Sequence, residues 1–174
     1  LDWLQKRFDM MGATVMALRL VSHRSARVRE ESVLLLLGLL QEGNPKVQNT
    51  IAVFLSQSRG KAVFKAIMDI LDTGAEALKD FKRTIKLVKR TIDKGGNTNR
   101  TLSLTSRGER EVLNLSGSEA VSLHTLTLTL RLLQLFCEGQ YRPLQQLVHR
   151  QPGLPNHDLL ERCLDLFEIV HPLL

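Results

Sequence analysis

Cysteine is scarce in this chain of 174 residues, which limits the ways in which its fold can be stabilised. The two cysteines, Cys137 and Cys163, lie far apart and form no Cys-x-x-Cys motif. Small secreted domains depend on several closely spaced cysteines, whereas proteins of reducing compartments keep their thiols free. The pattern argues against a disulfide framework and favours an intracellular setting, with both thiols as small core residues. A chain of this length can bury a core without such cross-links.

Long apolar runs are also missing. The longest run covers residues 33–37 and continues after Gly38 only as far as Leu40. A helix needs about 20 consecutive apolar residues to cross a bilayer. The chain begins at Leu1 without the charged, apolar and small-residue layout of a signal peptide. We therefore expect a fragment of a larger protein that does not itself span a membrane.

The common catalytic motifs are absent from the sequence. It contains no GxxxxGK phosphate loop, no HExxH zinc motif and no GxSxG nucleophile elbow. No two of the five histidines stand at the i, i+4 spacing of a helical metal site. His149 and His157, together with the cysteines, are therefore better interpreted as surface imidazoles and core thiols than as a metal site. The sequence predicts a protein that is not an enzyme and that holds no metal or cofactor.

Apolar residues at helical spacing dominate the sequence and predict an all-α protein. The helices are expected around residues 12–23, 26–40, 45–55, 63–71, 78–92, 121–136, 143–149 and 159–170. Thr73 and Glu76 have the spacing of a capping box and predict a separate start for the helix that continues to residue 92. A second capping box at residues 116–119 and Asn156 are the predicted starts of the last long helices. Residues 93–116 are rich in Gly, Ser, Thr and Arg and predict a long mobile loop.

Threonine alternates with leucine over residues 125–129, and this alternation also fits a short β-strand. The length of the apolar pattern around it favours a helix.

Two segments of the chain repeat the same order of features. Residues 39–49 and 135–146 each contain an apolar helix end, a Glu-Gly pair, a proline and an apolar residue followed by glutamine. Gly43 is suited to end its helix, and Pro45 is suited to the first turn of the next one. Repeated helical hairpins stack into solenoids, because each unit buries its apolar face only against its neighbours. We therefore expect a single helical-repeat domain over 1–174, with armadillo-like stacked hairpins, although two hairpins can share this layout by chance.

The net charge is +6, and the most concentrated set of cations lies on one predicted helix. Six cations lie on the side of the 78–92 helix opposite its apolar stripe, and we call this set the basic rail: Lys79, Lys82, Arg83, Lys86, Lys89 and Arg90. The rail is a candidate interface for an acidic protein surface, an anionic headgroup or nucleic acid. A solvated helix face is the simpler explanation, because the helix dipole also favours cations near the C-terminal end of a helix. The absence of aromatic residues on the charged side argues against nucleic acid, because base stacking needs them.

Several blocks of sequence resemble one known family. They are residues 11–14, 31–48, 62–65 and 132–140, including the Leu-Leu-Gln-Glu-Gly-Asn-Pro-Lys-Val-Gln run of 39–48 and the Leu-Gln-Leu-Phe-Cys-Glu-Gly run of 133–139. In this order they resemble the homology-associated domain of inositol 1,4,5-trisphosphate receptors and ryanodine receptors, nearer to the former. Pro143 and the 95–116 insertion depart from the family pattern.

The resemblance implies a cytosolic segment of a homotetrameric calcium-release channel in the endoplasmic reticulum membrane. Such a segment would contact other domains and subunits of the channel and pass conformational change between ligand-sensing and pore regions. No residue matches a ligand-binding motif of the family, so no small-molecule ligand is expected on this segment. Ser103, three residues after Arg100, is a candidate phosphorylation site.

A different class of function also fits the residues. A free-standing helical-repeat adaptor that binds acidic protein partners would show the same periodicity and the same basic rail. A nucleic-acid-binding repeat is favoured only by the net charge.

Overall fold

The computed structural model describes residues 1–94, 117–154 and 158–171, and these residues form helices without strands. The all-α prediction is therefore confirmed over the described part of the chain. The elements are α1 (Asp2–Met10), α2 (Ala13–Leu20), α3 (Ala26–Leu40), α4 (Pro45–Leu55), α5 (Gly60–Lys94), α7 (Gly117–Cys137), the 3₁₀ turn η1 (Glu138–Gln140), α8 (Arg142–His149) and α9 (Leu159–Val170).

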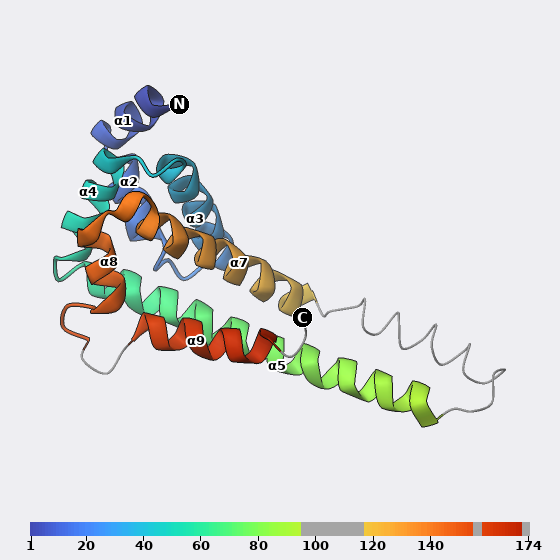
Figure 1. Cartoon of the computed structure of the whole chain (residues 1–174). Helices are drawn as coiled ribbons and strands as arrows, with labels where there is room; N and C mark the ends of the chain where they lie inside the picture. The colour runs from blue at the N-terminus through green and yellow to red at the C-terminus, as the bar shows by residue number, and fades with distance from the viewer. Residues whose placement is uncertain (95–116, 155–157, 172–174) are drawn as a thin grey trace.

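The two repeated segments form neighbouring helical hairpins. In Figure 1, α3 lies along α7 and α4 lies beside α8, and these pairs are in contact. Gly43 and Gly139 close the two hairpins with the same left-handed φ of 66°, which glycine adopts without steric cost. Pro45 stands in the first turn of α4, where its missing N–H costs nothing. The arrangement is compatible with armadillo-like stacking.

A glutamine joins the hairpins to each other. Gln48 of α4 is buried, and its Nε2 donates to the carbonyls of Leu135 at 3.2 Å and Glu138 at 3.0 Å. These carbonyls lie at the C-terminal end of α7, where the helix cannot supply partners of its own. Gln145 donates similarly to the carbonyl of Cys137 at 3.2 Å. The glutamines of the repeated pattern therefore cap the end of α7.

The predicted break at Thr73 is wrong, because α5 is one continuous helix of 35 residues. Thr73 caps nothing, since its hydroxyl donates to the carbonyl of Asp69 at 2.7 Å within the same helix. Gly74 lies directly against α7, where an added Cβ would stand 2.7 Å from Leu126 Cδ2. Packing against α7 and α9 spans the expected break and outweighs the local capping signal.

The ends of the last long helices differ from expectation. Asp158 is the N-cap of α9, because its Oδ1 accepts from the N–H groups of Leu160 at 2.8 Å and Glu161 at 3.2 Å. Asn156, the predicted cap, lies outside the described residues. The loop expected over 93–116 also lies outside them, except that α5 continues to Lys94. The predicted capping residue Ser116 is likewise outside, and α7 begins at Gly117.

The threonine-rich part of α7 is helical, as its length indicated. The hydroxyls of Thr125, Thr127 and Thr129 each donate to the carbonyl four residues earlier, at 2.8–2.9 Å. By length and composition alone, the segment Ala120–Gln140 is able to cross a membrane. A core helix passes the same test, and α7 packs between α3, α5 and α8. The expectation that the chain does not span a membrane stays a prediction.

The two thiols differ in part from the prediction. Cys137 and Cys163 are free and pack against the hydrophobic core, but both are partly exposed rather than buried. Burial raises the pKa of each thiol. The pKa of Cys163 is raised further by the charge of the Cys137 thiolate.

Candidate functional site: the basic rail of helix α5

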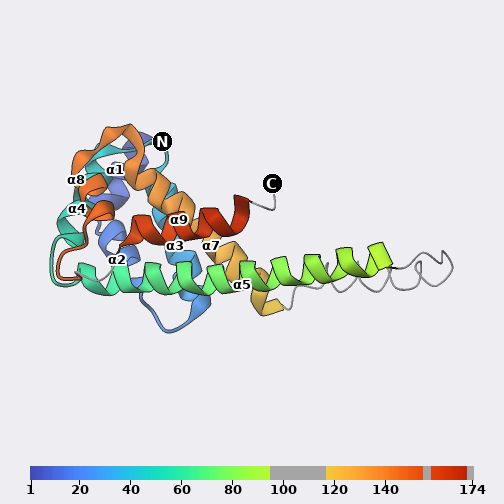
Figure 2. The same ribbon diagram turned by 60° about the horizontal axis from the view of Figure 1, so that its bottom comes forward.

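The rail lies on the last turns of α5. Phe81 and Ile85, on the apolar side of the same turns, are only half-buried. Figures 1 and 2 both show why: this end of α5 reaches past the end of α9 and away from the hairpins. The rail therefore begins beside the end of α9, where Lys82 contacts it, and continues onto the projecting end of α5.

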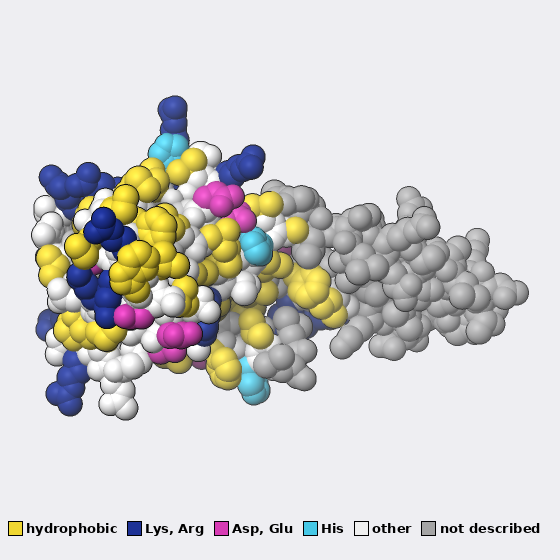
Figure 3. Space-filling model, turned by 90° about the horizontal axis from the view of Figure 1, so that it is seen from above, with side chains coloured by type: hydrophobic (Ala, Val, Ile, Leu, Met, Phe, Trp, Pro, Cys, Tyr) yellow, Lys and Arg dark blue, Asp and Glu magenta, His cyan; other side chains and the backbone are white. Residues whose placement is uncertain are grey.

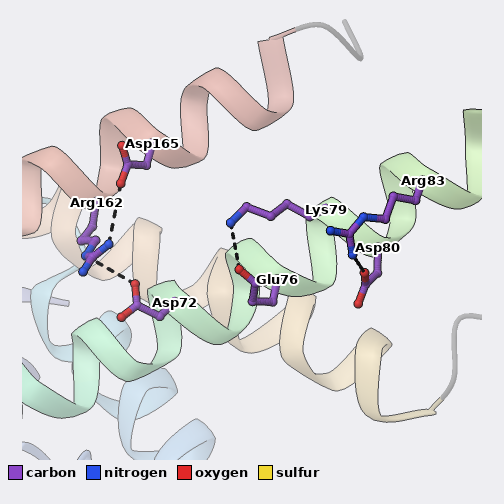
Figure 4. Close-up of polar contacts among 7 residues, drawn as sticks. All are labelled: Asp72, Glu76, Lys79, Asp80, Arg83, Arg162 and Asp165. Atoms are coloured by element: carbon purple, nitrogen blue, oxygen red, sulfur yellow. Dashed lines mark hydrogen bonds and ion pairs between the residues drawn. The ribbon is translucent and has the colours of Figure 1, made fainter.

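Two of the six cations are paired along their own helix. Figure 4 shows Lys79 with Glu76 and Arg83 with Asp80, at nitrogen–oxygen distances of 2.8 and 2.6 Å. These four side chains are exposed, so the pairs contribute little to stability. They do reduce the positive potential over this part of the rail, because each cation faces a carboxylate.

Lys82 has a structural partner in a different helix. Its Nζ lies 3.4 Å from the carbonyl of Ile169, near the C-terminal end of α9. A cation is favoured there, because the last carbonyls of a helix carry partial negative charge and lack partners in the helix. Lys82 therefore holds the end of α9 against α5.

A second contact between the same helices involves residues that the sequence analysis did not single out. Arg162 of α9 lies 3.4 Å from Asp72 of α5 and 3.8 Å from Asp165 of its own helix (Figure 4). The i, i+3 spacing of Arg162 and Asp165 is visible in the sequence. The pairing with Asp72 depends on how α9 packs, and no local pattern indicates it.

The remaining rail residues are more open. Lys86 and Arg90 are exposed, and neither has an ion pair among the residues that the structure describes. Lys89 belongs to α5, but its side chain lies outside the described part, as does the whole of Ser103. Among the described side chains of the rail, Lys86 and Arg90 are thus the cations without an ion pair, whereas Lys79, Lys82 and Arg83 make contacts within the chain.

A cavity that the sequence analysis missed lies near the start of α5. It has a volume of about 290 Å³ and lies between the α2–α3 loop, α5 and α7. Arg29, one of its lining residues, donates to the carbonyls of His23 at 2.9 Å and Arg24 at 3.2 Å. Its guanidinium is therefore hydrogen-bonded to the α2–α3 loop. Over the described ranges, no group of three His, Cys, Asp or Glu residues could hold a metal ion.

The comparison with known families concerns the second hairpin. Residues 121–172 match the family described as "RyR and IP3R Homology associated", where the abbreviations denote ryanodine and inositol trisphosphate receptors. The match covers most of α7 together with η1, α8 and α9, which is less than a third of the chain. No solved structure matches the chain. The match supports the ryanodine and inositol trisphosphate receptor family, and with it a place in a calcium-release channel.

Proposed function

We propose that this chain is a cytosolic scaffold segment of a homotetrameric calcium-release channel of the endoplasmic reticulum membrane, nearer to the inositol trisphosphate receptor. It passes conformational change between the ligand-sensing and pore regions, and its partners are other domains and subunits of the channel. The observation that carries the proposal is the family match over residues 121–172.

The packing of the hairpins supports a mechanical role. Gln48 bonds the end of α7 across the two hairpins, and one core is continuous through both. Close-packed cores resist continuous deformation, so a displacement of one hairpin is transmitted to the other. Transmission in the channel further requires two states that both regions bias.

The experiment that tests the function is an immunoblot of membrane and cytosol fractions with an antibody to this chain. A membrane-bound polypeptide many times larger than the chain is expected for a channel subunit. A soluble polypeptide near the size of the chain contradicts the proposal and favours the free-standing adaptor that binds acidic partners.

The rail is proposed as a contact with a neighbouring acidic surface, through Lys86 and Arg90. Replacing both with glutamate is expected to weaken that contact and alter channel opening without unfolding the segment. The matched control replaces Lys79 and Arg83 with glutamate, because these two cations already face carboxylates. Unchanged calcium release in the Lys86→Glu/Arg90→Glu channel would return the rail to an ordinary solvated helix face.

A further inference from the structure

Helix α1 is packed with its polar side inward. Gln5 and Asp9 are its buried residues. Gln5 Nε2 donates to the carbonyls of Gly38 at 3.1 Å and Gln41 at 3.0 Å, and Thr50 Oγ1 donates to Asp9 Oδ2 at 2.9 Å. A surface helix normally turns its apolar side to the core. Here hydrogen bonds attach the helix, and its apolar side faces outward.

The outward side of α1 is a broad apolar surface. Its exposed members around the helix are Leu1, Trp3, Leu4, Phe8, Met10 and Met11. Trp3 is 71% exposed and Met11 is 72% exposed. Figure 3, which views the molecule from the side of α1, shows hydrophobic side chains gathered there among Lys and Arg side chains. Apolar surface of this kind, with a charged rim, is typical of an interaction site.

A groove lies between α2 and α3, the helices that α1 packs against together with α4. It has a volume of about 300 Å³, and Leu20, Val28 and Leu35 line it. Leu35 stands one turn before Gly38, whose carbonyl accepts from Gln5 of α1. The groove therefore lies next to the part of α3 to which α1 is hydrogen-bonded. We call the exposed apolar side of α1 and this groove the head face.

The head face carries two unpaired cations. Arg27 lines the groove, and Arg7 stands one turn after Trp3 and Leu4 on α1; both are exposed, and neither has an ion pair within the described residues. Lys6 is already paired with Asp2 at 2.7 Å. Glu31 is the acidic residue that lines the groove. The face therefore favours an apolar partner with acidic residues at its edge.

Helix α9 offers such a partner surface. Leu160, Leu164 and Phe167 follow one another at helical spacing and are exposed, at 65% for Leu164 and 60% for Phe167. Leu159 and Leu166 point to the core instead. Glu161 and Glu168 are exposed along one edge of the outer stripe. We call this apolar stripe and its acidic edge the tail face.

We propose that the head face of one molecule binds the tail face of a second copy. An amphipathic helix seated in an apolar groove is a common recognition mode, and both the apolar and the charged parts of these faces are complementary. In Figure 1, α1 lies above the hairpins and α9 lies below them, so the two helices stand at different ends of the molecule. Head-to-tail contacts form a ring if the rotation closes and a chain if it does not. This inference does not depend on the proposed channel function.

The test is sedimentation equilibrium of the whole chain. We expect the mean mass to rise with concentration in the range on the order of 100 μM, as suits a small interface. Reversing the head charges (Arg7→Glu/Arg27→Glu) or the tail charges (Glu161→Lys/Glu168→Lys) is expected to weaken association about tenfold or more. A chain with all four substitutions regains opposite charges on the two faces and is expected to associate again. The matched control, Lys65→Glu/Arg142→Glu, changes exposed cations outside both faces and is expected to associate like the unaltered chain.

Three results would overturn the proposal. One is a chain that stays monomeric over this range with unchanged helical circular dichroism. Another is association that neither charge reversal weakens, which would place the contact elsewhere. The third is a monomer that sediments with phosphatidylcholine–phosphatidylserine vesicles and loses this binding on Trp3→Ser/Phe8→Ser substitution, which would make a membrane the occupant of the head face.

Discussion

At the scale of single residues, Gln48 shows how one buried side chain stabilises the contact between hairpins. Its side-chain amide donates hydrogen bonds to two carbonyls at the end of α7 that have no partner within that helix. A glutamine in a sequence is usually read as a surface residue. Its neighbour in the pattern, Asn44, is also buried: its Oδ1 caps α4, and its Nδ2 donates to Gln5 Oε1 at 2.9 Å.

Replacing Gln48 with leucine is expected to lower the free energy of unfolding by about 1–3 kcal/mol, because buried carbonyls lose their donors. Urea denaturation followed by circular dichroism measures this change. Gln146→Leu, on the exposed side of α8, is the control and is expected to change stability little. Equal losses in the two variants would mean that the Gln48 bonds contribute nothing specific.

The thiols give a prediction about pH. Burial raises the pKa of Cys137 and Cys163 in the folded chain, so the folded state holds these protons at a pH where the unfolded state releases them. Their contribution to stability is therefore complete below the unfolded thiol pKa of about 8.5 and is lost as pH rises through the raised values. We expect the free energy of unfolding to fall more steeply above this pH in the native chain than in Cys137→Ser/Cys163→Ser. Identical pH profiles for the two proteins would contradict the assignment.

At the scale of elements, close packing rather than local sequence determines the length of α5. Thr73 and Glu76 have the spacing of a helix start, yet the helix passes through them because α7 lies against Gly74. In a helix interior glycine costs about 1 kcal/mol relative to alanine. Here it allows α5 and α7 to approach each other.

Gly74→Ala is therefore expected to destabilise the chain by about 1–3 kcal/mol, because the new Cβ would overlap Leu126. Gly38→Ala provides the opposite case, since nothing lies within 4 Å of the Cβ position in α3. That variant is expected to gain up to about 1 kcal/mol from helix propensity. Thermal unfolding of both proteins measures the difference in stability. A stabilising Gly74→Ala would show that Leu126 of α7 can move away from the new Cβ at little cost.

At the scale of the whole molecule, the hairpins share one hydrophobic core. Leu36 of the first hairpin and Leu133 of the second belong to the same buried cluster. Damage to one hairpin is therefore expected to unfold both. The projecting end of α5 and the exposed apolar residues of α1 and α9 lie outside this cluster.

Leu36→Asp or Leu133→Asp is expected to abolish the folded state, because either change places an unpaired charge in the core. Leu34→Asp, on the exposed side of α3, is the control and is expected to leave the fold intact. Circular dichroism and one-dimensional NMR distinguish these outcomes. A folded Leu36→Asp protein would mean that the hairpins are less tightly packed than described.

More of the fold than of the candidate site could be predicted from the sequence. Helical spacing indicated most elements, but α1 was missed because Gln5 and Asp9 occupy its buried side and break the expected pattern. The rail was correctly placed on one helix. Its division into internal contacts and free cations could not be foreseen, because the Lys82 and Arg162 contacts depend on where α9 lies.

The sequence by itself determined the helical class, the Gly43 and Gly139 turns and the repeated hairpin pattern, since these follow from local periodicity and backbone preference. Tertiary structure alone decided that α5 is continuous, that Gln48 caps a helix distant in sequence and that α1 exposes its apolar side. The physical reason is the same in each case. Packing and hydrogen bonds between distant segments can exceed a local preference of about 1 kcal/mol, and no local pattern contains them.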